Sequence, residues 1–129
     1  MRAREMHEQH KAMAEELGDR AGVAMACGNL GICYDSTGDY GRARELHEQD
    51  RAICEALGDR AGVAAACGNL GKCYDSTGDY VRALAMHEEN RAICEALGDR
   101  AGEGVRQLWE VLLEHGGILS GDLLLHGAV

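Results

Sequence analysis

Residues 18–57 read GDRAGVAMACGNLGICYDSTGDYGRARELHEQDRAICEAL, and residues 58–97 repeat them as GDRAGVAAACGNLGKCYDSTGDYVRALAMHEENRAICEAL. The opening Gly-Asp-Arg-Ala-Gly begins at Gly18, Gly58 and Gly98, which gives a fixed spacing of 40 residues. Self-similarity at such a period indicates an array of stacked supersecondary units. We therefore divide the chain into the second helix of a partial repeat (1–17), two whole repeats (18–57 and 58–97) and a divergent C-terminal capping helix with a tail (98–129).

Each whole repeat contains two helical patterns, which in the first copy run from Gly22 to Ser36 and from Asp39 to Leu57. Apolar residues recur at three- and four-residue steps in both, so each helix has one face suited to packing. The first stripe comprises Val23, Cys27, Leu30 and Tyr34, and the second comprises Tyr40, Ala43, His47, Ile53, Cys54 and Leu57.

Capping residues mark the ends of these helices. Asp39 stands at the N-cap of the second helix, and Gly58-Asp59 is expected to end one repeat and begin the next. Gly31 lies inside the first helix, where glycine costs about 1 kcal/mol relative to alanine. We therefore expect a neighbouring helix to approach closely over Gly31.

Composition excludes several classes of protein. The chain of 129 residues has 18 Gly and neither Pro nor Phe, so its core must be built from small and aliphatic side chains. Its formal net charge of -9 disfavours binding to nucleic acid and to anionic membranes. No apolar run reaches the roughly 18 to 20 residues of a membrane span, and the N-terminus lacks a secretory signal. We expect a soluble cytoplasmic protein.

The repeated motif resembles a known family. Asn29-Leu30-Gly31 with Tyr34, followed by Gly38-Asp39-Tyr40 and Ala43, is similar to the tetratricopeptide repeat, and the set recurs 40 residues later. The resemblance covers residues 1 to about 104, and the 40-residue unit resembles the subclass of G-protein-signalling-modulator (Pins-type) scaffolds. It implies an all-α solenoid, in which antiparallel helix pairs wind into a right-handed superhelix. The first helix of each pair would line a concave groove.

The cysteines belong to the repeat template, because Cys27, Cys33 and Cys54 return as Cys67, Cys73 and Cys94. No two in one helix lie at the three- or four-residue spacing that directs side chains at one metal ion. We expect buried, reduced thiols. Redox sensitivity at Cys33 or Cys73 is the alternative, and a disulfide framework is the least favoured.

The histidines resemble a metal site only in part. His7-Glu8-Gln9-His10 is one residue too short for the His-x-x-x-His spacing of a zinc hydrolase, and the later copies replace the second His by Asp50 and Asn90. We expect His47 to pair with Asp50, and His87 with Asn90, near the interfaces between repeats. The sequence predicts neither a metal site nor a cofactor.

No motif for catalysis is present. The sequence has no nucleophile elbow, phosphate-binding glycine loop or Ser/His/Asp arrangement. It therefore predicts a protein that is not an enzyme.

The first helices of the two repeats differ only at Met25 against Ala65 and at Ile32 against Lys72. These positions share the helix face opposite the packing stripe, and the resemblance places there the asparagine that binds a peptide backbone. The candidate groove residues are Met25, Asn29, Ile32, Asp35, Ala65, Asn69, Lys72 and Asp75. Drift of an exposed face is the alternative explanation of the two differences.

These features predict a protein-interaction module that binds a peptide or helix in the concave groove. One alternative is a structural array with no groove ligand, which self-associates through the N-terminal helix, where Met6, Met13 and Leu17 lack a partner. Another, of a different class, is a metal- or thiol-dependent protein that uses His7, His10 and the cysteines.

The C-terminal part departs from the repeat. An apolar stripe after about Gly102 predicts a separate terminating helix that ends at Gly116-Gly117, with Trp109 covering the last repeat helix. The stripe comprises Val105, Leu108, Trp109, Leu112 and Leu113. In the tail, residues 123–125 predict one short helix.

Overall fold

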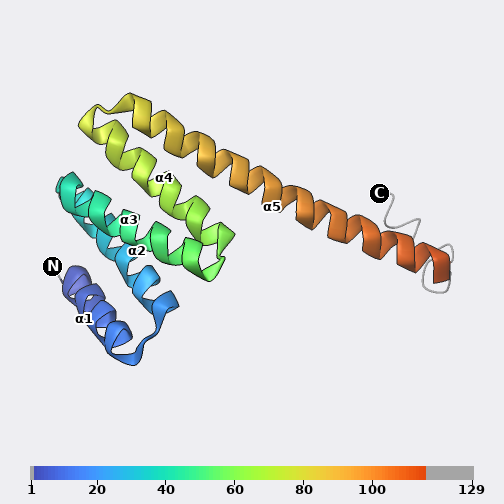
Figure 1. The fold of residues 1–129 in the computed structure, drawn as a ribbon, viewed down its shortest axis with the longest axis horizontal. Helices are drawn as coiled ribbons and strands as arrows, with labels where there is room; N and C mark the ends of the chain where they lie inside the picture. The colour runs from blue at the N-terminus through green and yellow to red at the C-terminus, as the bar shows by residue number, and fades with distance from the viewer. Residues whose placement is uncertain (1, 116–129) are drawn as a thin grey trace. The chain divides into compact units, whose positions relative to one another are not determined.

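The computed structural model describes residues 2–115, and within them the chain forms five α-helices and no strand (Figure 1). The helices are α1 (Arg2–Leu17), α2 (Arg20–Ser36), α3 (Tyr40–Leu57), α4 (Arg60–Thr77) and α5 (Tyr80–His115). The all-helical solenoid fold expected from the repeat is therefore confirmed. The bounds of α2 and α3 agree with the predicted helix pair to within two residues.

The four turns between helices use the same pair of residues, a glycine followed by an aspartate. Gly18, Gly38, Gly58 and Gly78 adopt φ values of 68°, 83°, 73° and 83°, a region that favours glycine. The aspartate that follows then caps the next helix: Asp39 accepts a hydrogen bond from the Arg42 amide at 3.3 Å, and Asp59 accepts one from the Gly62 amide at 2.9 Å. The predicted cap at Asp39, and the predicted end of one helix and start of the next at Gly58-Asp59, are confirmed.

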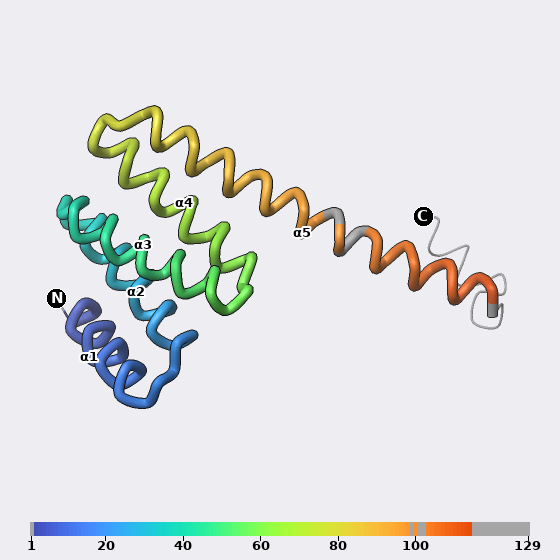
Figure 2. Tube along the Cα trace, in the orientation of Figure 1, coloured from blue at the N-terminus to red at the C-terminus, as the bar shows by residue number. Residues whose placement is uncertain are grey.

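Successive helices from α1 to α4 pack against one another, and the chain reverses direction at each turn (Figure 2). Helices α2 and α4, which are equivalent in the two repeats, also contact each other directly. The same bond recurs 40 residues apart, since the Tyr34 hydroxyl donates to Glu8 at 3.5 Å and the Tyr74 hydroxyl donates to Glu48 at 3.4 Å. Hydrogen bonds between equivalent repeat positions thus connect each repeat to the one before it.

Small side chains fill the core, as the composition predicts. Alanine and cysteine are the most frequent buried residues, and the buried aliphatic side chains include Leu30, Val63 and Leu70. Gly31 is also buried, and a Cβ atom there would lie 2.5 Å from the His47 ring. The expected close approach over Gly31 exists, but the group that approaches is an imidazole rather than a backbone.

Helix α5 differs from the sequence-based expectation. It continues through Gly98, which keeps a helical φ, so the expected break before a separate terminating helix is not formed. The physical reason is that the buried positions of α4, such as Val63 and Cys67, correspond 40 residues later to Glu103 and Gln107. A chain that turned back here in the register of the repeat would therefore set polar side chains against the preceding helix at these positions.

By packing, the chain divides into Met1–Cys94 and Glu95–Val129, with the boundary inside α5. In the second unit Trp109, which was expected to be covered, is 41% exposed. The predicted helix end at Gly116-Gly117 and the short helix of residues 123–125 lie outside the described residues.

Candidate functional site

A groove of about 540 Å³ lies in the first unit, between α2 and α4. Its lining residues are Ile32, Asp35, Ser36, Tyr40, Asn69, Lys72, Asp75 and Ser76. All but Tyr40, the first residue of α3, come from the C-terminal halves of α2 and α4. Because the two helices are equivalent in the repeat and contact each other, residues at the same template positions meet across the groove.

The groove gathers five of the eight candidate residues: Ile32, Asp35, Asn69, Lys72 and Asp75. The other three, Met25, Asn29 and Ala65, lie nearer the N-terminal ends of the same helices and do not line it. Met25 is 64% exposed and Asn29 is half-buried, so neither is part of the packed core.

Sequence reasoning missed three lining residues. Ser36 and Ser76 occupy one template position, and their shared 40-residue spacing was an available signal. The sequence pattern places Tyr40 on the packing stripe of α3, but the residue lies at the helix start, where its half-buried side chain lines the groove.

The groove is lined by both acidic and basic side chains. Asp75 is exposed and lies 3.1 Å from the His87 Nε2 atom, whereas Lys72 is exposed and forms no ion pair within the described part of the chain. The half-buried Asn69 amide likewise makes no hydrogen bond to any described residue. The groove therefore offers a cation and an amide that are available to a ligand.

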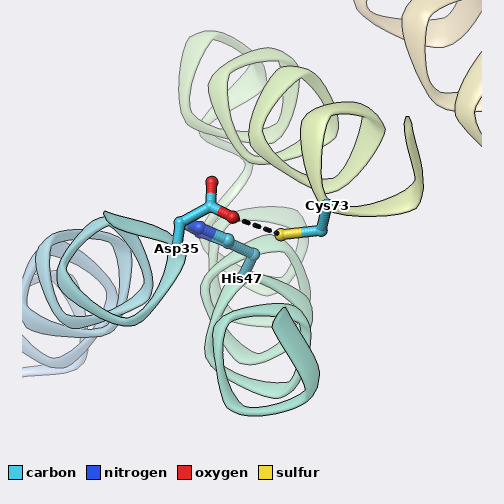
Figure 3. Close-up of side chains that lie close together, drawn as sticks. All are labelled: Asp35, His47 and Cys73. Carbon is cyan, nitrogen blue, oxygen red and sulfur yellow. Dashed lines mark hydrogen bonds between the residues drawn. The ribbon is translucent and has the colours of Figure 1, made fainter. Parts of the chain in front are cut away.

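Asp35, which lines the groove, also belongs to a cluster with the buried His47 and Cys73 (Figure 3). The three side chains come from α2, α3 and α4, and their potential ligand atoms all lie within 4.8 Å of one another. The Cys73 thiol donates to Asp35 Oδ1 at 3.7 Å. Sequence reasoning missed this cluster because its members, separated by 12 and 26 residues, form no local motif.

The cluster is electrostatically unusual. Burial lowers the pKa of His47, and the charge of Lys72 lowers it further, although Asp35 acts in the opposite direction. Burial, together with the charge of Asp35, raises the pKa of the Cys73 thiol to about 11. In the absence of a further positive charge, His47 is neutral and Cys73 is a protonated thiol near neutral pH.

The expected histidine pairs are wrong. Both ring nitrogens of His47 lack a partner, while Asp50 accepts a hydrogen bond from the Cys54 thiol at 3.3 Å. In the next repeat His87 bonds to Asp75, and Asn90 donates to the Ala64 carbonyl at 2.6 Å. The members of each pair therefore contact different neighbours and not each other.

The six cysteines are all free thiols, of which Cys27, Cys54, Cys67 and Cys73 are buried, Cys33 is half-buried and Cys94 is exposed. The expected burial is therefore confirmed for four of them. Burial raises the pKa of Cys54, helped by its bond to Asp50, to about 12. Such a thiol is a weak nucleophile, as expected for a core residue.

Comparison with known proteins identifies the repeat. The family model of the tetratricopeptide repeat matches residues 26–61 and 66–101, more than half of the chain. A search of curated proteins found no match. Among the described residues, no helix has both the length and the apolar character needed to cross a membrane.

Proposed function

Because the chain belongs to the tetratricopeptide repeat family, whose repeats mediate contacts between proteins, we propose that it is a non-enzymatic module that captures a peptide or helix in the groove between α2 and α4. One observation carries the proposal: five candidate contacts, chosen on repeat position, line a single groove. Six free thiols suit a reducing compartment, so we place this function in the cytoplasm.

The chemistry of the groove suggests the ligand. Ile32 is 50% exposed and provides an apolar contact, and the Asn69 amide is available to bond a peptide backbone. Asp35 and Asp75 favour a basic side chain, while Lys72 favours a carboxylate. We infer an extended or helical peptide with an apolar residue next to a basic one. The 40-residue period supports a further proposal, that the protein acts as a Pins-type scaffold.

A peptide-display selection followed by binding measurements tests the proposal. Peptides enriched on the wild-type protein should bind Asn69→Ala about 5- to 10-fold more weakly, since a lost hydrogen bond costs about 1 kcal/mol or slightly more. Lys72→Ile, which copies the residue of the preceding repeat, should change the sequences that are selected.

Glu88→Ala is the matched control, because Glu88 is exposed on α5 and does not line the groove. Enriched peptides that bind wild type, Asn69→Ala and Lys72→Ile with equal affinity would show that the groove is not the binding surface.

Self-association through α1 is the second candidate function. Met6, Met13 and Leu17 are 66%, 61% and 80% exposed, and Met6 and Met13 line a shallow depression on this helix. Contiguous exposed apolar residues are a common mark of an interaction surface. Sedimentation as a function of concentration tests this candidate.

A further inference from the structure

The starting observation is an unpartnered polar side chain in the core. Among the described residues, the one polar or charged side chain that is fully buried is His47, at 0% exposure. Neither Nδ1 nor Nε2 has a hydrogen-bond partner. Leaving a buried polar group unpaired costs about 1 to 3 kcal/mol. His87, at the same template position, instead is exposed and bonds to Asp75.

The surroundings of His47 supply two further metal-ligand groups. Asp35 and Cys73 approach from the helices on either side of α3 (Figure 3). Zn–O and Zn–S bonds of about 2.1 and 2.3 Å in a tetrahedron place oxygen and sulfur about 3.6 Å apart. The observed distance between Asp35 Oδ1 and Cys73 Sγ is 3.7 Å. The oxygen and sulfur are thus already spaced as in a tetrahedral site, and the remaining separations, up to 4.8 Å, require only small side-chain movements.

We propose that Asp35, His47 and Cys73 form a three-ligand binding site for a zinc ion at the interface between the two whole repeats. One oxygen, one nitrogen and one sulfur ligand suit zinc, which accepts all three. On binding, the Cys73 thiol releases its proton to solvent and the Zn–S bond replaces the S–H bond. The charges of the ion, the Asp35 carboxylate and the Cys73 thiolate then sum to zero, which lowers the cost of burying the ion.

In a three-ligand site a water molecule would take the fourth position of the ion. The half-buried Asp35 lines the groove as well as the cluster and so connects the site to the groove, whereas His47 and Cys73 are buried and do not line it. Two cations oppose binding, because Lys72 acts on His47 and Arg44 acts on Cys73 electrostatically. The ion links α2, α3 and α4, and its binding is expected to stabilise the interface between repeats.

The following repeat provides a natural comparison. Asp75 and His87 occupy the template positions of Asp35 and His47, but the residue 40 positions after Cys73 is Leu113. The second Asp–His pair therefore has no cysteine at the equivalent position of the repeat. Variants of His87 are matched controls for variants of the proposed site.

Cobalt titration tests the site, because Co²⁺ takes the same ligands as Zn²⁺ and a cobalt–thiolate bond gives a charge-transfer absorption band. The full chain is purified without a metal-affinity column, stripped with a chelator and kept reduced. We expect one equivalent of Co²⁺ to produce the band, one equivalent of Zn²⁺ to abolish it, and Zn²⁺ to raise the melting temperature. Cys73→Ser and Asp35→Asn should weaken Zn²⁺ binding by about 100-fold or more. Even residues that only hydrogen-bond to a metal ligand contribute about 10- to 100-fold to metal affinity.

The controls separate this site from other metal-binding residues. His87→Ala and His10→Ala should keep the band and the zinc affinity, and circular dichroism shows whether each variant is folded. The proposal is overturned if wild type shows no charge-transfer band, if Cys73→Ser retains it, or if His87→Ala or His10→Ala removes it while remaining folded.

Discussion

Asp50 shows how one residue decides the character of a repeat interface. Burial raises its pKa above the ordinary value of 3.8, although the hydrogen bond from Cys54 acts in the opposite direction. The equivalent Asn90 instead donates to the Ala64 carbonyl at 2.6 Å. A carboxylate at position 50 cannot donate to the equivalent carbonyl, that of Ala24, and it bears a cost of desolvation that the amide avoids.

We expect Asp50→Asn to stabilise the protein at neutral pH by about 1 kcal/mol, the usual net contribution of one hydrogen bond. A raised pKa means that ionisation of Asp50 destabilises the folded state, so wild type loses stability as pH rises from 3.8 through the raised value. The advantage of Asp50→Asn should accordingly shrink below the ordinary aspartate pKa. Denaturant unfolding at neutral pH and at a pH below 3.8 measures the difference in stability between wild type and Asp50→Asn.

Asn90→Asp is the matched reverse substitution and should destabilise the protein at neutral pH. Equal stability of wild type and Asp50→Asn at neutral pH would mean that the amide does not reach the Ala24 carbonyl.

Gly31 is a second residue whose side chain, or lack of one, determines packing. A Cβ atom there would lie 2.5 to 2.8 Å from three ring atoms of the buried His47. We expect Gly31→Ala to destabilise the protein by about 1 to 3 kcal/mol through overpacking. Gly71→Ala should cost less, because the ring it meets belongs to the exposed His87, which can move outward at the cost of its contact with Asp75.

Gly41→Ala is the control, since Gly41 is helical, has no atom within 4 Å of its Cβ position and corresponds to Val81 in the next repeat. It should stabilise the helix by up to about 1 kcal/mol. Thermal unfolding measures both variants. A melting temperature of Gly31→Ala that equals or exceeds that of Gly41→Ala would refute the packing explanation.

At the scale of the element, the repeat allowed most of the fold to be predicted. Alternation of glycine–aspartate turns with two apolar stripes located α2, α3 and α4 because each local signal agreed with the packing of the array. The prediction was wrong after Leu97, where the same Gly-Asp signal lies within α5. A turn residue permits a reversal, but burial of an apolar face in the register of the repeat supplies the free energy, and here Glu103 and Gln107 stand at the positions of the buried Val63 and Cys67.

The same difference between local sequence signals and tertiary packing explains which parts of the candidate site could be predicted. Five of the lining residues could be predicted because they occupy repeated positions on the helix face opposite the packing stripe, as Asn69 and Lys72 do, whereas Ser36, Ser76 and Tyr40 were missed. The Asp35–His47–Cys73 cluster could not, because it depends on side chains of three helices from two repeats meeting in space.

Alanine at Gly58 and at Gly98 should therefore have opposite effects, although both begin a Gly-Asp-Arg-Ala-Gly segment. Gly58 has φ 73°, so Gly58→Ala should destabilise the protein by about 1 kcal/mol or more. Gly98 is helical with no atom within 4 Å of its Cβ position, so Gly98→Ala should increase helicity. Circular dichroism during thermal unfolding measures both, and loss of helicity in Gly98→Ala would contradict the continuity of α5.

At the scale of the whole molecule, the exposed apolar residues of α1 determine whether the protein stays a monomer. Met6, Met13 and Leu17 are each more than half exposed. Burial of one large apolar side chain contributes about 1.5 to 3 kcal/mol, and a two-fold contact buries the set from both copies. Association costs about 4 to 15 kcal/mol in lost translational and rotational freedom, so the net gain is small.

We therefore expect a weak, concentration-dependent dimer, with an association free energy of about 7 kcal/mol in favour of the dimer and a dissociation constant of roughly 10 micromolar. Met13→Glu should abolish it, because a two-fold contact would bring the new carboxylate near its symmetry mate. Val81→Glu, at a residue of α5 that is 82% exposed, is the control and should leave the dimer intact.

Sedimentation velocity over a concentration series distinguishes the outcomes. A dimer that persists in Met13→Glu, or a wild-type protein that is a monomer at all concentrations, contradicts the prediction. Species larger than a dimer would indicate head-to-tail contacts, since a surface that meets a different surface on the next copy does not close after two subunits.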